Sequence, residues 1–260
     1  MEKENLYRQL IKTIEDYPSI HKLLDNGFIR NQCKNGIASR LLKQVKENNI
    51  QHLSGIERKL NQIVSDSGYI RLNKVLKAAR DFDSYFAFLS HIDAILLFRK
   101  YAILNEIEPP LPDSNRYSDI ALLFNGSGIY CEVYSLSQPK KSKQYRSGTY
   151  TEEDDDTNVD KITRRLFKKI NQQLLLDYPN ILILSTAKTG DFEPTINRVM
   201  RRTFPQKPQV TLVMLCSLEN SSKLGESPYW YLNEYSPYHN LGHKFLKHIQ
   251  QEHKLIRLDD

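Results

Sequence analysis

Apolar residues recur at helical spacing through the first part of the chain. Sets of apolar positions three or four residues apart predict short amphipathic helices, for example Leu6, Leu10, Ile11 and Ile14, or Ile56, Leu60 and Ile63. Glycines separate these sets, and Ser54 is a suitable helix N-cap. The pattern predicts an N-terminal helical region over residues 1–80, followed by a second domain over residues 81–260.

The segment 84–104 has a different pattern, because its apolar residues lie on nearly all sides of the expected helix. Such a helix must be buried or covered on two faces. Asp93 lies within it, and a carboxylate in so apolar a helix needs a partner. A local pairing with His91 or Arg99 and a role in a functional site both agree with this pattern.

Strand-like runs follow the prolines at positions 109, 110 and 112. The runs 121–124 and 129–134 are joined by Asn-Gly-Ser-Gly, which predicts a β-hairpin. The remaining expected elements are a first strand at 103–108, a polar loop at 137–157, a helix at 158–177, a strand at 180–185, a helix around Ile196 and Val199, a strand at 210–216, an edge strand at 229–235 and a basic tail helix at 240–258. This order predicts an α/β fold with a mixed β-sheet flanked by helices.

The composition describes a globular protein, with 40% apolar residues and a net charge of +6. No apolar run approaches the length of a membrane span, and the charged N-terminus has no signal-peptide pattern, so we expect a cytoplasmic protein without membrane contact. Cys33, Cys131 and Cys216 are too few and too widely spaced for a disulfide framework or a zinc cluster.

Two carboxylates interrupt the expected hairpin. Asp119 stands at the entry to its first strand, and Glu132 lies inside its second strand. A carboxylate in an apolar strand is costly to bury unless something pairs with it, and two of them on one hairpin can chelate a divalent cation. Purely structural roles also agree with the pattern: Asp119 as a cap beside Ser118, and Glu132 as an edge-strand charge paired with an arginine such as Arg116.

The element order and these acids resemble the PD-(D/E)xK nuclease superfamily, with its restriction-endonuclease-like fold, over roughly residues 84–186. In that family a helix supplies an optional acid, the second strand opens with an aspartate, and the third strand carries Glu-x-Lys. Asp93, Asp119 and Glu132 match these acids. The resemblance implies that they bind Mg²⁺ or Mn²⁺, with Glu106 or Glu108 as further acids near the site.

One position departs from the family pattern, because Tyr134 stands where the lysine is expected. Tyr134 shares a strand face with Glu132 but provides no fixed positive charge. Three hypotheses account for the tyrosine: a displaced lysine, a substitution by Tyr134 through hydrogen bonding, or an inactive site. The candidates for a displaced lysine are Lys161 and Lys169 on the following helix, with Gln173 one turn from Lys169, and Lys140, Lys141 and Lys143 after the strand.

Basic side chains gather on the helices that follow the hairpin, and two tyrosines lie in the polar loop. These residues are Arg164, Arg165, Lys168, Lys169, Arg198, Arg201, Arg202 and Lys207, with Tyr145 and Tyr150. Such residues bind phosphates and stack on bases, although each basic residue also suits a solvated helix face. Histidines at 239, 243, 248 and 253 have ligand-like spacing, but a solvated basic helix explains them better.

Together these patterns predict a divalent-metal-dependent nuclease that hydrolyses phosphodiester bonds of DNA or RNA through a degenerate Asp…Glu-x-Tyr site. The expected partner is a nucleic acid, and the N-terminal helices offer a surface for a protein partner. The alternative is an inactive nuclease-like fold that acts as a nucleic-acid- or protein-binding module. A third interpretation is a helical interaction protein whose β-half is structural.

Overall fold

The computed structural model describes residues 8, 12–13, 15–23, 50–63, 82–101, 103–112, 115–136, 152–186, 193–217, 229–249 and 254–256. The helices are α2 (Pro18–Leu23), α5 (Ile50–Asn61), α7 (Phe82–Lys100), α8 (Glu152–Gln173), α9 (Glu193–Thr203), the 3₁₀ helix η2 (Phe204–Gln206) and α10 (His239–Ile249). The strands are β1 (Leu104–Ile107), β2 (Ile120–Phe124), β3 (Ser127–Ser135), β4 (Asn180–Thr186), β5 (Val210–Ser217), β6 (Tyr229–Leu232) and β7 (Lys254–Ile256).

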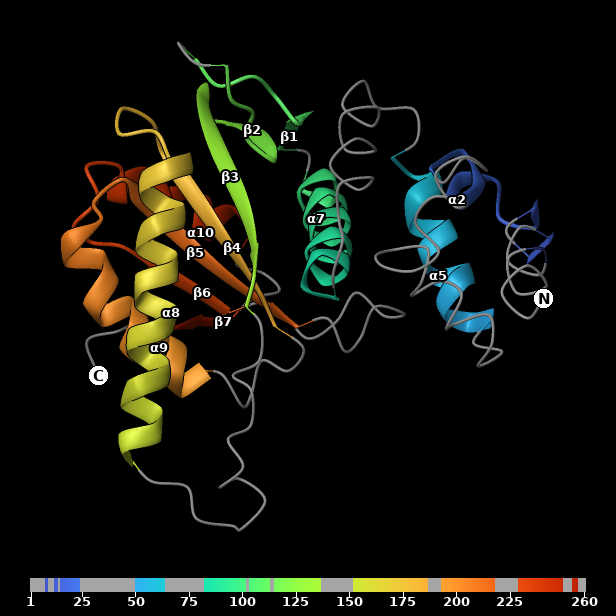
Figure 1. The fold of residues 1–260 in the computed structure, drawn as a ribbon. Coiled ribbons are helices and arrows are strands. Elements are labelled where there is room, and N and C mark those ends of the chain that lie inside the picture. The colour runs from blue at the N-terminus through green and yellow to red at the C-terminus, as the bar shows by residue number, and fades with distance from the viewer. Residues whose placement is uncertain are drawn as a thin grey trace.

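The strands form one mixed sheet in which neighbours follow the order β1 to β7 (Figure 1). The first three strands pair antiparallel, whereas β3, β4 and β5 run parallel. Strand β6 is antiparallel to β5, and β7 is parallel to β6. The prediction of an α/β fold with a mixed sheet flanked by helices is therefore confirmed.

A two-residue turn closes the hairpin between β2 and β3. Phe124 pairs with Ser127, and both Asn125 and Gly126 have positive φ angles, of 50° and 76°. Positive φ at both central positions is the type I′ geometry that Asn-Gly favours. The pairing of Ile120 with Cys131 sets the register and brings the start of β2 beside the middle of β3.

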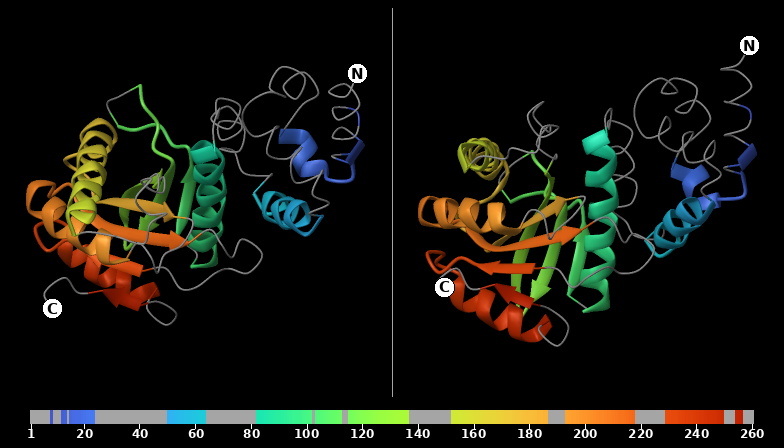
Figure 2. Two further views of the ribbon diagram at one scale, coloured as in Figure 1. Left: turned by 60° about the horizontal axis from the view of Figure 1, so that its bottom comes forward. Right: turned by 90° about the horizontal axis from the view of Figure 1, so that it is seen from below.

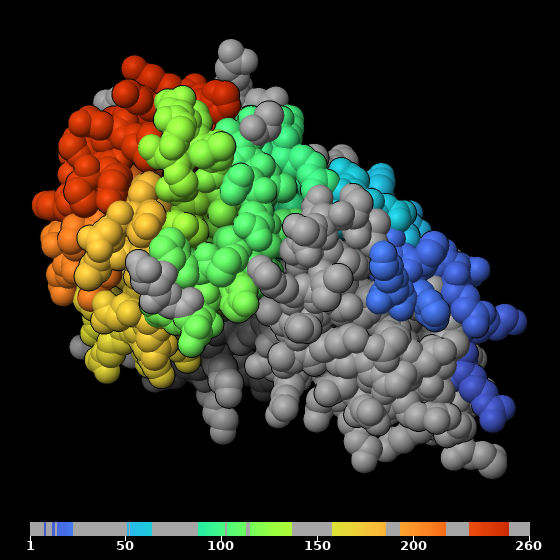
Figure 3. Space-filling view, turned by 90° about the horizontal axis from the view of Figure 1, so that it is seen from above, coloured from blue at the N-terminus to red at the C-terminus, as the bar shows by residue number. Residues whose placement is uncertain are grey.

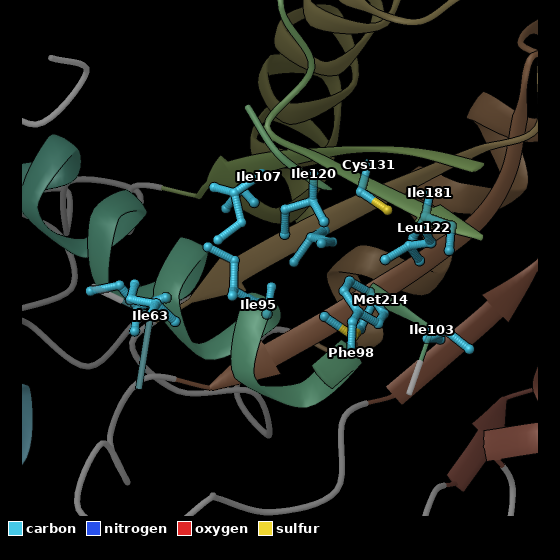
Figure 4. Close-up of a cluster of buried hydrophobic side chains, with 14 of the residues drawn as sticks. Ile63, Ile95, Phe98, Ile103, Ile107, Ile120, Leu122, Cys131, Ile181 and Met214 are labelled. Carbon is cyan, nitrogen blue, oxygen red and sulfur yellow. The ribbon is translucent and has the colours of Figure 1, made fainter. Parts of the chain in front are cut away.

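Helices cover both faces of the sheet (Figure 2), and alternating side chains of its strands belong to two hydrophobic cores. On one face, Ile181 and Met214 meet helix α7, together with α10 (Figure 4). On the opposite face, Leu182 and Val213 meet α8 and α9. This alternation is the period-2 pattern of strands that are covered on both sides.

Helix α7 lies between the sheet and the described N-terminal helices (Figures 1 and 2). Its residues Phe88, Ile92 and Ile95 belong to the same buried cluster as Leu53 and Leu60 of α5. The two-sided cover expected for this apolar helix is confirmed. The described part of the N-terminal region therefore shares the core of the α/β part.

Several predicted boundaries change in the structure. The helix expected at 158–177 begins at residue 152 and ends at Gln173. The tail helix prediction is wrong at residues 254–256, which pair with β6 as strand β7, so β6 is not an edge strand. The loop prediction over 137–157 is wrong at residues 152–157, which belong to α8, and its residues 137–151 lie outside the described part of the chain. Further apolar sets at 37–45 and 72–76, whose spacing also predicts helices, lie outside it too.

No helix in the described part of the chain is both long enough and apolar enough to cross a membrane.

Candidate functional site

The two hairpin acids lie near one another, Glu132 on β3 and Asp119 at the entry to the neighbouring strand β2. Glu132 is 1% exposed and stands on β3, which has β2 on one side and β4 on the other. Asp119 directly precedes β2, and its Oδ2 accepts a 2.6 Å hydrogen bond from the Val133 amide. Glu132 is therefore not an edge-strand charge. Its expected arginine partner, Arg116, instead donates to the carbonyl of Gln172.

Helix α8 brings a lysine to this acid pair. The apolar side of α8, with Leu166 and Ile170, packs on the sheet, and Lys169 lies beside that stripe. The Lys169 ammonium is 3.0 Å from Oε2 of Glu132 and donates a 2.8 Å hydrogen bond to Oε1 of Gln173. Of the three hypotheses for position 134, this geometry favours a displaced lysine.

The charges around Glu132 do not balance. Burial raises its pKa, the neighbouring Asp119 raises it further, and Lys169 opposes both, which leaves the Glu132 pKa at about 8. Burial alone would lower the pKa of the Lys169 ammonium, but the charges of Glu132 and Asp119 outweigh burial and raise it. Two carboxylates thus face one ammonium.

The two acids and one ammonium together favour binding of a further cation. In the described part of the chain, the buried Oε1 of Glu132 has no hydrogen-bond partner. A buried carboxylate oxygen without a donor is costly, and a divalent cation removes that cost by accepting its lone pair. Carboxylate oxygens are the ligands that Mg²⁺ and Mn²⁺ take in proteins.

A second group of donors adjoins Asp119. One ligand atom each from His91, Glu108 and Asp119 lie within 4.8 Å of one another. Nε2 of His91 is 2.9 Å from the Asp119 carbonyl, which only accepts hydrogen bonds, so Nε2 carries the proton. In the neutral ring, Nδ1 then directs a lone pair toward Oε1 of Glu108, 3.8 Å away. A cation between them satisfies both.

The backbone at Glu108 supports a functional assignment. Glu108 has a φ of 52°, a left-handed conformation that is uncommon for residues other than glycine. Its amide donates to the Asp119 carbonyl, so the two residues stand opposite each other beyond the ends of β1 and β2. Strained positions of this kind concentrate at functional sites, where they direct a side chain.

Asp93, the helix acid of the predicted site, is not among these donors. Its carboxylate pairs with Lys59 of α5 at 2.6 Å. His91 takes the place on α7 that was expected for Asp93. Residues two positions apart in a helix point in widely different directions, so one helix face cannot present both side chains to the acids.

Tyr134 is half-buried and packs against the α8 side of the sheet. It lies near enough to Lys169 to contribute to that residue's raised pKa.

Sequence reasoning named Glu108 only as an acid near the site and did not name His91 as a ligand. The available signal was a histidine inside an otherwise apolar helix, together with an acid directly before two prolines. The histidines of the tail form no ligand group among the described residues, where His239 contacts the Ser236 carbonyl and His248 contacts that of Tyr101.

Comparison of the chain with protein-family models, curated proteins and solved structures finds no match.

Proposed function

We propose that the protein is a divalent-metal-dependent nuclease with restriction-endonuclease-like architecture, in which Lys169 replaces the lysine missing at position 134. The observation that carries this proposal is the contact between Lys169 and Glu132 beside Asp119. Two acids from neighbouring strands and one ammonium are the groups that phosphodiester hydrolysis in this superfamily requires.

The element order supports the proposal. Helix α7 precedes the antiparallel strands β1, β2 and β3, and α8 then crosses to β4, which is parallel to β3. This is the order that the resemblance implied from sequence. The lysine comes from α8 and not from β3, which accounts for a tyrosine at position 134.

The proposed divalent cation is held by Asp119 and Glu132, and His91 and Glu108 form with Asp119 a second donor group that does not include Glu132. A cation there would polarise a phosphoryl oxygen and lower the pKa of bound water. An imidazole among carboxylates favours a softer ion than Mg²⁺, so Mn²⁺ suits this set better.

The remaining side chains have distinct roles in the proposed reaction. Lys169 holds a positive charge where negative charge develops on the phosphate, and Gln173 fixes the direction of its ammonium. Glu132, with its raised pKa, carries a proton over much of the neutral range in the free protein, and it gives up that proton when it becomes a ligand.

The direct test is cleavage of single-stranded DNA, duplex DNA and RNA in Mn²⁺ or Mg²⁺. We expect Asp119→Asn and Glu132→Gln to lower cleavage by at least about 10²-fold, because ligand losses exceed the losses seen for residues that only orient ligands. Asp93→Asn is the matched control and should stay close to the parent protein.

Cleavage that survives both substitutions would refute the site. If the folded parent protein cleaves none of these substrates with either ion, the proposed nuclease function is refuted. The interpretation as a binding module then replaces it.

A further inference from the structure

One side of α8 carries a line of long polar side chains, which we call the α8 flank. It consists of Lys161, Arg165, Lys168 and Gln172, all of them exposed. Spacings of four, three and four residues place them on one side of the helix. At 1.5 Å per residue, the flank is about 16 Å long.

The α8 flank differs from the side of the helix that faces α9 and η2. On that second side, Asp160 pairs with Arg202, and Lys207 donates to Asn171 at 2.7 Å and lies over the ring of Phe167. Basic groups there contribute to packing between helices. Within the described part of the chain, no acid pairs with Lys161 or Lys168.

The α8 flank adjoins the proposed catalytic site. Lys168 precedes Lys169, whose ammonium contacts Glu132. Arg116 donates to the Gln172 carbonyl, which joins the segment before β2 to the last turn of the flank. Figure 3 shows the strands of the hairpin region (green) and the segment of α8 and β4 (yellow) as neighbours on one face.

An exposed aromatic ring belongs to the segment before β2, which Arg116 joins to α8. Tyr117 is 49% exposed and lies two residues before Asp119. The segment is extended, because the Leu111 amide bonds to the Arg116 carbonyl and the Ser118 amide to that of Pro109. Tyr117 pairs there with Pro110, directly before the segment that carries Asp119 into β2.

We propose that the α8 flank and Tyr117 bind one strand of unpaired nucleic acid and lead it into the site, an inference that rests on the proposed nuclease function. Lys161, Arg165 and Lys168 contact successive phosphates, and Tyr117 stacks on a base. One line of cations complements one backbone, and an exposed ring stacks on a base only if that base is unpaired. The substrate is therefore single-stranded DNA or RNA, or an unpaired end.

The test measures binding of a fluorescently labelled oligothymidylate by anisotropy in EDTA, so that no cleavage occurs. The double variant Lys161→Gln/Lys168→Gln removes two cations from the flank. Its matched control, Lys244→Gln/Lys247→Gln, removes two exposed cations from α10, which covers the opposite face of the sheet. Circular dichroism verifies that both variants are folded.

We expect the flank variant to lose at least tenfold in affinity and the control to lose less than twofold. Two lost phosphate contacts should reduce the slope of log K against log salt by about 1.4 for a single strand. Equal losses in both variants, or an unchanged slope in the flank variant, would overturn the assignment of the flank.

Tyr117→Leu tests the stacking contact separately. It should lower affinity for the single strand about tenfold without changing the salt slope, and it should not affect binding of a duplex with the same sequence. Duplex binding as tight as single-strand binding, or no effect of Tyr117→Leu on either, would refute single-strand recognition.

The two proposals fail in different ways. If the parent protein binds the strand through the flank but cleaves nothing, the nuclease function fails and the binding surface stands. If the protein cleaves nucleic acid but the flank variant binds and cleaves normally, the binding surface fails alone. Ribonucleotide and deoxyribonucleotide versions of the oligomer then identify the preferred sugar.

Discussion

Two lysine–carboxylate pairs occupy different parts of the molecule. Lys59 of α5 meets Asp93 of α7 at 2.6 Å, and Lys169 of α8 meets Glu132 of β3 at 3.0 Å. In both pairs, burial is the largest cause of a raised carboxyl pKa. In contact geometry alone the pairs are similar.

They differ in what surrounds the carboxylate. The Asp93 side chain is 30% exposed, and the nearby charge that shifts its pKa is the opposing ammonium of Lys59. Glu132 is 1% exposed and has a second acid, Asp119, beside it. The first arrangement joins two helices, whereas the second places two acids beside one ammonium inside the protein. Glu132 can lose its proton at neutral pH only if a further cation binds there.

The largest difference between the two pairs should appear in the cleavage rate when each lysine is substituted in turn. Lys169→Met should lower the cleavage rate about 10²- to 10³-fold, because a preorganised charge at the reacting phosphate is lost. Lys59→Met should change it less than threefold, since the Lys59 ammonium pairs with Asp93 and not with the site acids. Initial rates on a single-stranded substrate measure both effects, and near-parental cleavage by Lys169→Met would place the catalytic charge elsewhere.

The pH dependence of stability should distinguish the two carboxylates next. A carboxyl whose pKa is raised in the folded state binds its proton more tightly there than in the unfolded chain. Stability of the metal-free protein therefore falls as pH rises from the ordinary carboxyl range, near 4.5, toward the folded value of about 8 for Glu132. Glu132 should account for a loss of about 4 kcal/mol over this window.

The measurement is the unfolding midpoint in EDTA from about pH 4 to 8.5, which spans the window between the unfolded and folded pKa values of Glu132. Glu132→Gln should flatten the profile far more than Asp93→Asn does. Parallel profiles for the parent protein and Glu132→Gln would mean that Glu132 is not protonated in the folded state.

Divalent cations should stabilise the protein through the pair that contains Glu132 and not through the pair that contains Asp93. Mn²⁺ at about 100 times its dissociation constant should add about 2.7 kcal/mol to the free energy of unfolding. Asp119→Asn and Glu132→Gln should abolish this increment, while Asp93→Asn keeps it. His91→Asn should weaken the response to Mn²⁺ more than the response to Mg²⁺, because imidazole binds the softer ion better. An undiminished Mn²⁺ shift in Glu132→Gln would exclude it as a ligand.

The smallest effect concerns the helix pair. Lys59→Met should lower the free energy of unfolding by about 1 kcal/mol. The loss is small because solvent screens the attraction between the charges of a partly exposed ion pair. For a chain of this size, that lowers the unfolding midpoint by roughly 2–4 °C. A loss several times larger in urea unfolding would show that the pair anchors the N-terminal helices and is not a minor contact.

The hairpin and its acids could be predicted from the sequence because their signals are local. Asn125 and Gly126 specify the turn, and apolar alternation sets the register that joins Asp119 to Glu132. Residues 254–256 show the opposite case. Their helix pattern is overridden by pairing with β6, a strand on the other side of α10 in the sequence.

The rest of the candidate site depends on geometry that spacing does not encode. Periodicity places Lys169 and Gln173 on one side of α8 but cannot say which side meets β3. His91 and Asp93 are equally conspicuous in their apolar helix, and only the packing of α7 decides between them. Glu108 reaches the site through a left-handed backbone conformation that no sequence pattern predicted.

The apolar surface of α7 has a consequence for biosynthesis. A ribosome delivers α5 before α7, and it delivers α7 before the β3 strand that covers its second face. Until the strands of the sheet emerge, that second face of α7 is incompletely covered, and such exposed apolar surface invites aggregation. Helix α5 is made earlier and can cover the other side of α7 while the sheet is still being synthesised.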